Sequence, residues 1–185
     1  MKQNGKRWIS LALVLCMVLT LLPTTAWAAN WDVGMNWVYD NATTLTGENT
    51  WNIQEGCTLT IQNSITIAAG ATLTLTGSGT IQAALTDVGT AGQLFIVEGT
   101  LVIDGVTIRG PGVKVGTNGY SAISVSGNAT CIMNSGVIEK FYRSSYGAAV
   151  STTNHITSTS ETVATGGVFT MTGGTIRDNT CVGTS

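Results

Sequence analysis

One eight-residue pattern recurs along this chain and constrains its fold more than any other feature. The pattern reads LVIDGVTI at 101–108, CIMNSGVI at 131–138 and FTMTGGTI at 169–176. Each copy has an apolar residue at its first, third and eighth places and Gly or Ser at its fifth. An earlier copy, LTLTGSGTI at 73–81, fits when one residue is inserted. The copies start at residues 73, 101, 131 and 169, so the steps are 28, 30 and 38 residues. An irregular period in this range with a fixed core pattern indicates a solenoid.

The alternation within each copy predicts which side chains face the interior. Successive residues of a strand point to opposite faces, so the first and third places share a face. Coils stacked about 4.8 Å apart would align equivalent residues in interior columns. We expect three such columns: Leu101 with Cys131 and Phe169, Ile103 with Met133 and Met171, and Ile108 with Ile138 and Ile176.

A second apolar pair precedes each copy and supplies another strand of the coil. These pairs are Leu94 with Ile96, Ile123 with Val125, and Ala148 with Val150. No single coil can bury its own apolar face, so its stability must come from its neighbours. We therefore predict an all-β chain folded as a right-handed parallel β-helix, a solenoid of about five or six coils. The alternative is an antiparallel β-sandwich, but the repeat steps are too long for hairpins.

The coil sequences resemble those of a known group. GGVFTMTGGTIRDN at 166–179 and EGTLVIDGVTIRG at 98–110 look like the coils of pectin-lyase-like right-handed β-helix proteins. They are especially similar to large repetitive surface proteins of Gram-positive gut bacteria. The resemblance covers roughly residues 51–185 and implies an adhesin-like bacterial surface protein. Relatives by fold include polysaccharide lyases and glycoside hydrolases, so the resemblance leaves an enzyme open as an alternative.

Residues 1–29 have the pattern of a secretory signal peptide. The basic start KQNGKR at 2–7 precedes a 14-residue apolar run at 9–22, and AWA at 26–28 is a small-residue cleavage signal. A membrane anchor is the alternative, but the run is shorter than the roughly 20 residues that a span needs. We predict cleavage near Ala29, no membrane span in the mature chain, and an extracellular protein that is secreted or held at the cell surface.

The rest of the chain divides into a cap segment and the coils. Residues 30–55 lack the pattern and contain Trp31, Trp37 and Trp51. We expect this segment to cap the exposed strand edges at the end of the solenoid, with a sugar-stacking platform as the alternative. Residues 56–185 are predicted to form the coils, and we expect the solenoid to be truncated at its C-terminal end.

Charge limits the partners that this chain can bind. Beyond the predicted cleavage site, five basic and ten acidic residues give 5 − 10, a net charge near −5. Such a chain does not attract nucleic-acid phosphates or an anionic membrane surface. We therefore expect no nucleic acid, and we expect glycans or proteins of a host or cell wall as partners.

The candidate ligand-binding residues fall in two places. KFYRSSY at 140–146 is expected to be an exposed aromatic and basic cluster whose candidates are Lys140, Phe141, Tyr142, Arg143 and Tyr146. The alternative is a corner loop that packs on its own coil. Arg109 and Arg177 each follow the last Ile of their copy, and Glu139 holds the equivalent place between them. We expect an Arg–Glu–Arg ladder on a solvated face, with part of an acidic-glycan site as the alternative.

The sequence predicts no catalytic residue, no metal ligand and no cofactor. Glycoside hydrolysis needs two carboxylates about 5–9.5 Å apart, yet Asp104 and Asp178 hold different places relative to the pattern. The single histidine, His155, lies in a Thr/Ser-rich segment away from other ligand types. Cys57 and Cys131 occupy alternating apolar positions, so we expect buried free thiols.

Together these features predict a non-catalytic, adhesin-like stalk or a rod that binds glycans or proteins outside the cell. The alternative is a polysaccharide lyase or glycoside hydrolase that acts on acidic polysaccharide.

Overall fold

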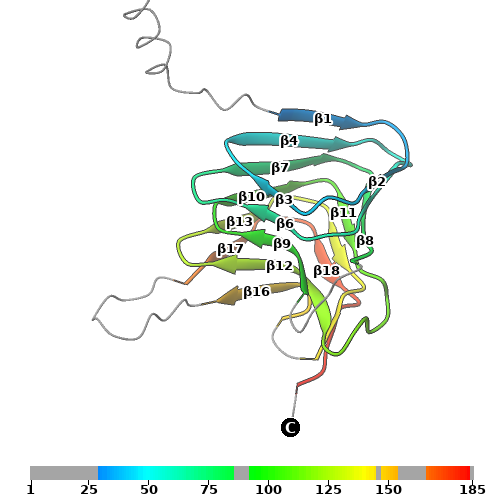
Figure 1. The fold of residues 1–185 in the computed structure, drawn as a ribbon, viewed down its shortest axis with the longest axis vertical. Helices are drawn as coiled ribbons and strands as arrows, with labels where there is room; N and C mark the ends of the chain where they lie inside the picture. The colour runs from blue at the N-terminus through cyan, green and yellow to red at the C-terminus, as the bar shows by residue number, and fades with distance from the viewer. Residues whose placement is uncertain (1–28, 86–91, 145–146, 154–165, 184–185) are drawn as a thin grey trace, which may run out of the picture.

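The chain folds as an all-β right-handed parallel β-helix (Figure 1). The computed structural model describes residues 29–85, 92–144, 147–153 and 166–183. Each coil visits three sheets in turn, and each strand pairs with the equivalent strand of the next coil. Because this pairing is parallel almost throughout, the predicted β-helix is confirmed, and the alternative of an antiparallel sandwich is wrong.

The three sheets are called A, B and C. Sheet A contains β1 (Ala29–Val33), β4 (Glu48–Ile53), β7 (Thr72–Gly77), β10 (Thr100–Asp104), β13 (Thr130–Met133) and β17 (Val168–Met171). Sheet B contains β2 (Trp37–Tyr39), β5 (Thr58–Ile61), β8 (Thr80–Ala83), β11 (Thr107–Arg109), β14 (Val137–Glu139) and β18 (Thr175–Arg177). Sheet C contains β3 (Thr43–Leu45), β6 (Ile65–Ile67), β9 (Gly92–Val97), β12 (Gly119–Ser126), β15 (Tyr142–Arg143) and β19 (Thr180–Cys181).

Sheet C departs from the regular pattern beside β12. The first residues of β12 pair antiparallel with β15, and its last residues pair parallel with β16 (Val150–Thr153). Among the described strands, β12 and β15 form the one antiparallel pair. Two strands of the following coil, β15 and β16, therefore share the place next to β12. This arrangement determines where the residues around 140–143 lie.

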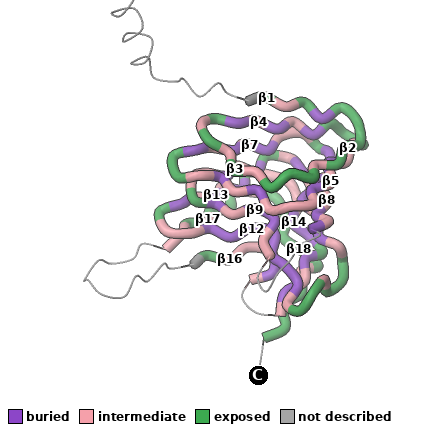
Figure 2. The backbone as a smooth tube through the Cα atoms, in the orientation of Figure 1, coloured by how far each residue is buried: buried purple, intermediate pink, exposed green. Residues whose placement is uncertain are grey.

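The register of the columns predicted from the repeat is confirmed, but their last members Met171 and Ile176 are 43% and 38% exposed, because β17 and β18 are the last described strands of sheets A and B. Strand pairing places Leu101 opposite Cys131 and Cys131 opposite Phe169. The same strand pairing aligns the members of the other two predicted columns. The earlier copy of the repeat extends the first column, because Leu73 pairs with Leu101. Buried and outward residues alternate along the central strands of sheets A and B, such as β7, β8 and β10 (Figure 2). The core is therefore one continuous apolar stack enclosed by the three sheets.

The apolar pairs predicted before each copy are displaced from the observed register. Ile123 pairs with Phe95 and with Val150, not with Leu94 and Ala148. Val97 is buried in the interior, whereas Ile96 is only partly buried and pairs with Ser124. The prediction failed here because LFIV at 94–97 is a run of four apolar residues, in which alternation does not reveal the inward face.

Residues 30–55 contribute strands to all three sheets. Strands β1, β2 and β3 make a complete coil, and they pair in parallel with β4, β5 and β6. The interior side chains of the second coil are therefore covered by strands that continue the same sheets. No helix in the part of the chain that the structure describes is long and apolar enough to cross a membrane.

Glycines at the corner between sheets A and B let successive coils approach closely. Gly77, Gly105, Gly136 and Gly174 all have a positive φ there, a conformation that L side chains rarely adopt. A Cβ added to Gly77 would lie 2.1 Å from the carbonyl oxygen of Ile53 in the preceding coil. The corner thus requires Gly for its backbone conformation and for its contact with the neighbouring coil.

Replacing Gly77 with Ala is expected to cost more stability than replacing Gly70. Gly70 also has a positive φ, of 77°, but nothing lies within 4 Å of a Cβ added there. Gly70→Ala should therefore lose only the conformational term, about 1–2 kcal/mol. Gly77→Ala should lose about 1–3 kcal/mol more, because the coils must separate. Urea unfolding measures both values, and equal losses would contradict the steric explanation.

The register of sheet C can be tested with a pair of neighbouring substitutions. Val97→Thr places a hydroxyl in the apolar interior and should cost about 1–3 kcal/mol. Ile96→Thr changes a residue on the outer side of the same strand and should cost less than about 1 kcal/mol. Thermal or urea unfolding gives the two free energies of unfolding. The opposite order would restore the register that was predicted from the sequence.

Candidate functional site

The arginine ladder consists of Arg109, Glu139 and Arg177 on the outer face of sheet B. These residues end β11, β14 and β18, and the strand register places each beside the next. The Nε of Arg109 donates to Glu139 Oε1 at 2.7 Å, and the Nε of Arg177 donates to Glu139 Oε2 at 2.9 Å. The Nη2 of Arg177 lies 2.8 Å from the same Oε2. The predicted ladder is therefore present, and one carboxylate links three successive coils.

The members of the ladder differ in their exposure to solvent. The side chains of Arg109 and Arg177 are 41% and 56% exposed, whereas that of Glu139 is 2% exposed. The expectation of a fully solvated ladder is thus wrong for Glu139, because the two arginine side chains cover it. Burial would raise the pKa of the Glu139 carboxyl, but hydrogen bonds and charges from Arg109 and Arg177 outweigh this effect and lower the pKa.

Two residues beside the ladder fix and extend it. The Nε2 of Gln82 donates to the carbonyl oxygens of Arg109 and Gly110, at 3.3 and 3.2 Å. Lys140 follows Glu139 with a φ of 63° and an exposed side chain. Asp178, which is exposed, follows Arg177 in the same way that Lys140 follows Glu139. The ladder, Lys140 and Asp178 together carry three positive and two negative charges, so this surface has a local net charge of +1 on a chain whose formal net charge is −2.

The cluster predicted at 140–146 is only partly exposed. Phe141 is 1% exposed and packs edge-on against Tyr120, with ring centroids 6.0 Å apart. Arg143 is buried, and its Nη1 donates to Ser121 Oγ and to the carbonyl oxygen of Gly92. The predicted exposure is wrong for these two residues, because β15 pairs with β12 and turns alternate side chains inward.

The remaining members of that cluster lie elsewhere. Lys140 is exposed and Tyr142 is half-buried, so these two can still meet a ligand. Tyr146 lies outside the described residues, as does His155.

The two carboxylates considered for catalysis are held at different corners of the coil. Asp104 ends β10 in sheet A and accepts a hydrogen bond from Ser135 Oγ at 2.7 Å. Asp178 follows β18 in sheet B and has a φ of 54°. A complete strand of sheet B therefore separates the two positions along the coil, and they belong to different coils. The fold does not bring them together as a catalytic pair.

The thiols and the metal-ligand types are distributed as follows. Cys131 is buried as expected, and burial raises its pKa to about 12. Cys57 is a free thiol that is only half-buried, and Cys181 is exposed. In residues 29–85, 92–144, 147–153 and 166–183, no group of three or more His, Cys, Asp or Glu side chains could hold a metal ion.

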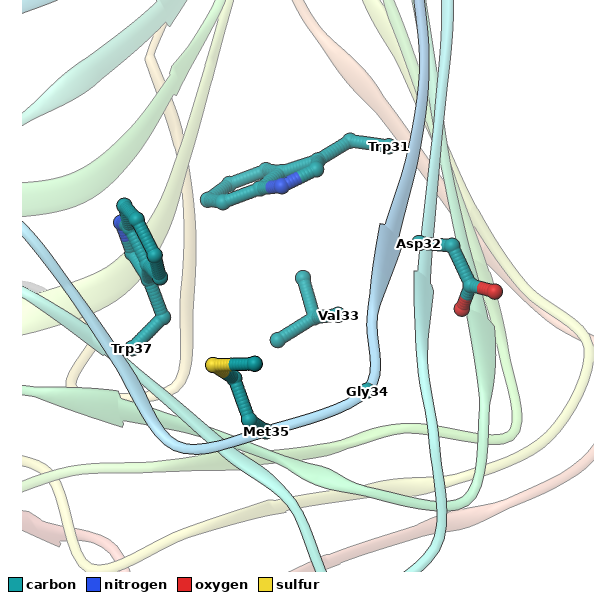
Figure 3. A pocket seen from close by; sticks show the side chains of 6 residues that line it. All are labelled: Trp31, Asp32, Val33, Gly34, Met35 and Trp37. Carbon is teal, nitrogen blue, oxygen red and sulfur yellow. The ribbon is translucent and has the colours of Figure 1, made fainter.

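The tryptophans of the first coils have two different environments. Trp31, Tyr39 and Trp51 form an aromatic cluster with ring centroids 5.3–5.9 Å apart. Trp51 is buried in this cluster, consistent with a role in closing the end of the core. Trp37 is 51% exposed and lines a pocket with Trp31 (Figure 3). The sequence grouped the three tryptophans together, and only the strand register separates them.

A polar ladder on sheet A was not predicted from the sequence. The Nδ2 of Asn52 donates to Asp32 Oδ1 at 3.0 Å, and the Nε2 of Gln54 donates to the same oxygen at 3.0 Å. Further along the rod, Thr172 Oγ1 donates to Asn134 Oδ1 at 3.1 Å. The strand register could have revealed part of this column, because Asp32 pairs with Asn52 and Asn52 pairs with Thr76.

The stability contributed by Glu139 should depend on pH with a defined sign. Its folded pKa lies below the ordinary value of 4.5, so its contribution is present above about pH 4.5 and is lost as pH falls through the folded pKa. The difference in stability between the native protein and Glu139→Gln should therefore shrink on acidification. Thermal unfolding of both proteins from pH 7 to pH 3 measures it. Glu48→Gln, an exposed residue on sheet A, is the control. A difference that does not change with pH would contradict the charge-based role of Glu139.

Comparisons of this chain with protein-family models, with curated proteins and with solved structures give no match. The assignment of a parallel β-helix rests on the strand pairing.

Proposed function

We propose that the protein is a secreted or cell-surface, non-catalytic β-helix rod that binds acidic glycans through the arginine ladder. Residues 1–29 support export, because they have the pattern of a cleaved signal peptide. The first described strand begins at Ala29, so removal of residues 1–29 would take only one residue from the first coil. The resemblance of the coils to adhesin-like surface proteins of Gram-positive gut bacteria points in the same direction.

The observation that carries the proposal is the pair of half-exposed guanidinium groups fixed by Glu139. Parallel pairing spaces the three strands about 4.8 Å apart, so the ladder has a fixed geometry before any ligand binds. Planar guanidinium groups recognise carboxylate and sulfate oxygens through paired hydrogen bonds. Lys140 adds a further positive charge at the same edge. An acidic glycan lying along the rod would meet these groups on a rigid surface.

The enzymatic alternative requires different geometry. A lyase or glycoside hydrolase that acts on acidic polysaccharide would need carboxylates or bases gathered around the bound sugar. Asp104 and Asp178 lie at different corners of different coils. Glu139 has both oxygens engaged by arginine side chains. This arrangement favours a binding role for the ladder over a catalytic one.

Substitutions in the ladder and at Lys140 should change glycan binding in opposite directions. Glu139→Gln removes the negative charge between Arg109 and Arg177 but keeps an amide oxygen that can accept from one of them, so affinity for an acidic glycan such as polygalacturonate should rise about two- to fivefold. Lys140→Ala should weaken binding, whereas Lys114→Ala, in the connection between β11 and β12, should not. Glycan arrays and calorimetry at low and physiological salt measure these affinities, and salt should weaken binding.

The same preparations distinguish the two functions. Incubation with acidic polysaccharides should yield no new reducing ends and no unsaturated products. Turnover that disappears in Glu139→Gln or in Asp104→Asn would replace the binding proposal with the enzymatic one. The binding proposal would also be rejected if no acidic glycan in the panel binds, or if the affinity is unchanged by Glu139→Gln and by Lys140→Ala.

A further inference from the structure

A pocket of about 150 Å³ lies at the N-terminal end of the described rod. Figure 3 shows the side chains of Trp31, Val33, Met35 and Trp37 around one space, with Asp32 directed to the other side of its strand. Trp31 and Val33 come from β1, Trp37 begins β2, and Met35 lies in the connection between them. The pocket is thus built from one short stretch of chain at the first corner of the solenoid.

The pocket exists because interior columns of the solenoid end here. Trp37 pairs with Leu59, and Leu59 pairs with Ile81, so the three side chains belong to one inward column. Leu59 and Ile81 are fully buried, but Trp37 is 51% and Met35 is 64% exposed. Among the described strands, β1 and β2 have a neighbour on one side only. Two large apolar side chains therefore face solvent beside the pocket.

The lining combines apolar surface with two unused hydrogen-bond donors. Within the described residues, neither the Trp31 nor the Trp37 indole N–H donates a hydrogen bond to the protein. The lining contributes no positive charge, and its one carboxylate, Asp32, accepts hydrogen bonds from Asn52 and Gln54 outside the pocket. An anionic ligand would find no counter-charge in this lining.

We propose that this pocket binds a single neutral pyranose ring. A pyranose has an apolar face of C–H groups, which suits the face of one indole, and hydroxyl oxygens that can accept from the N–H at the edge of the other. An apolar cavity of about 150 Å³ holds one six-membered ring such as benzene. Met35 is unbranched and flexible, so it can adjust to the sugar. The site lies three strand positions from Arg109 in sheet B and differs from the arginine ladder in the charge of its ligand.

The indole N–H signals in a ¹H–¹⁵N NMR spectrum of the secreted protein test this directly. Neutral monosaccharides and short oligosaccharides should shift the signals of Trp31 and Trp37 in a saturable way, with dissociation constants in the millimolar range. The signal of Trp51 should shift less than those of Trp31 and Trp37, because Trp51 is buried and meets the sugar only through its contact with the Trp31 ring. Galacturonate, which carries a negative charge, should bind more weakly than galactose.

Substitutions on one strand separate stacking from general effects. Trp37→Ala should weaken sugar binding about tenfold, while Trp37→Phe keeps a ring and should lose less. Val38→Ala is the control, because Val38 is 55% exposed on the same strand but lies in the outward column with Thr60. Trp37 is half-exposed, so its replacement should leave the fold intact, which the dispersion of the amide signals checks.

Several outcomes would overturn the proposal. If indole or phenol shifts the indole N–H signals and neutral sugars do not, the pocket is an apolar site. Sugar-induced shifts that survive in Trp37→Ala, or saturable shifts caused by no neutral sugar, would reject it as well. The arginine ladder is tested with acidic ligands and with Glu139 and Lys140 variants, so failure of either site leaves the other interpretable.

Discussion

The structure depends on the pairing of each coil with the coils on either side of it. A single coil of three short strands cannot bury its own apolar residues or satisfy its own backbone N–H and C=O groups. Stacking solves both problems together, because the parallel register that pairs Leu101 with Cys131 also aligns their side chains in the core. Every close contact between coils, including that of Gly77 with the Ile53 carbonyl, follows from this spacing. Outward side chains inherit the same spacing, which is why ladders of interacting residues form on the surface.

The repeat predicted the fold because its apolar places are separated by polar or small residues. Leu101, Ile103 and Ile108 could be assigned to the interior by alternation alone, and the structure confirms them. Alternation gave no answer within LFIV at 94–97, where the buried residues that continue the columns are Phe95 and Val97. The first coil lacks the repeat pattern, yet Trp31 occupies an interior place because it pairs with Trp51. Larger aromatic side chains fill that end of the core, so the sequence of the first coil does not match the repeat pattern of the later coils.

The candidate sites show a similar division between what sequence and tertiary structure determine. The alignment of Arg109, Glu139 and Arg177 followed from their equal places in the repeat, but the burial of Glu139 depends on how the arginine side chains fold over it. The exposure of Phe141 and Arg143 was predicted wrongly, because the antiparallel pairing of β15 with β12 joins distant parts of the chain and cannot be inferred from the local sequence. The two resulting surfaces are chemically distinct. One presents positive charge on a sheet face, and the other presents uncharged aromatic rings at an end of the described rod.

The link made by Glu139 has a consequence for how such a rod can change in length during evolution. Because all coils share one register, gain or loss of a whole coil by duplication or deletion would shift the later coils by one strand spacing and keep the columns aligned. The coil that carries Glu139 is an exception. Its loss would bring Arg109 and Arg177 into adjacent positions, with two like charges side by side and no carboxylate between them. Loss of this coil is therefore the deletion least compatible with this face, whereas the coil that has Thr60 at the same place carries no charge there.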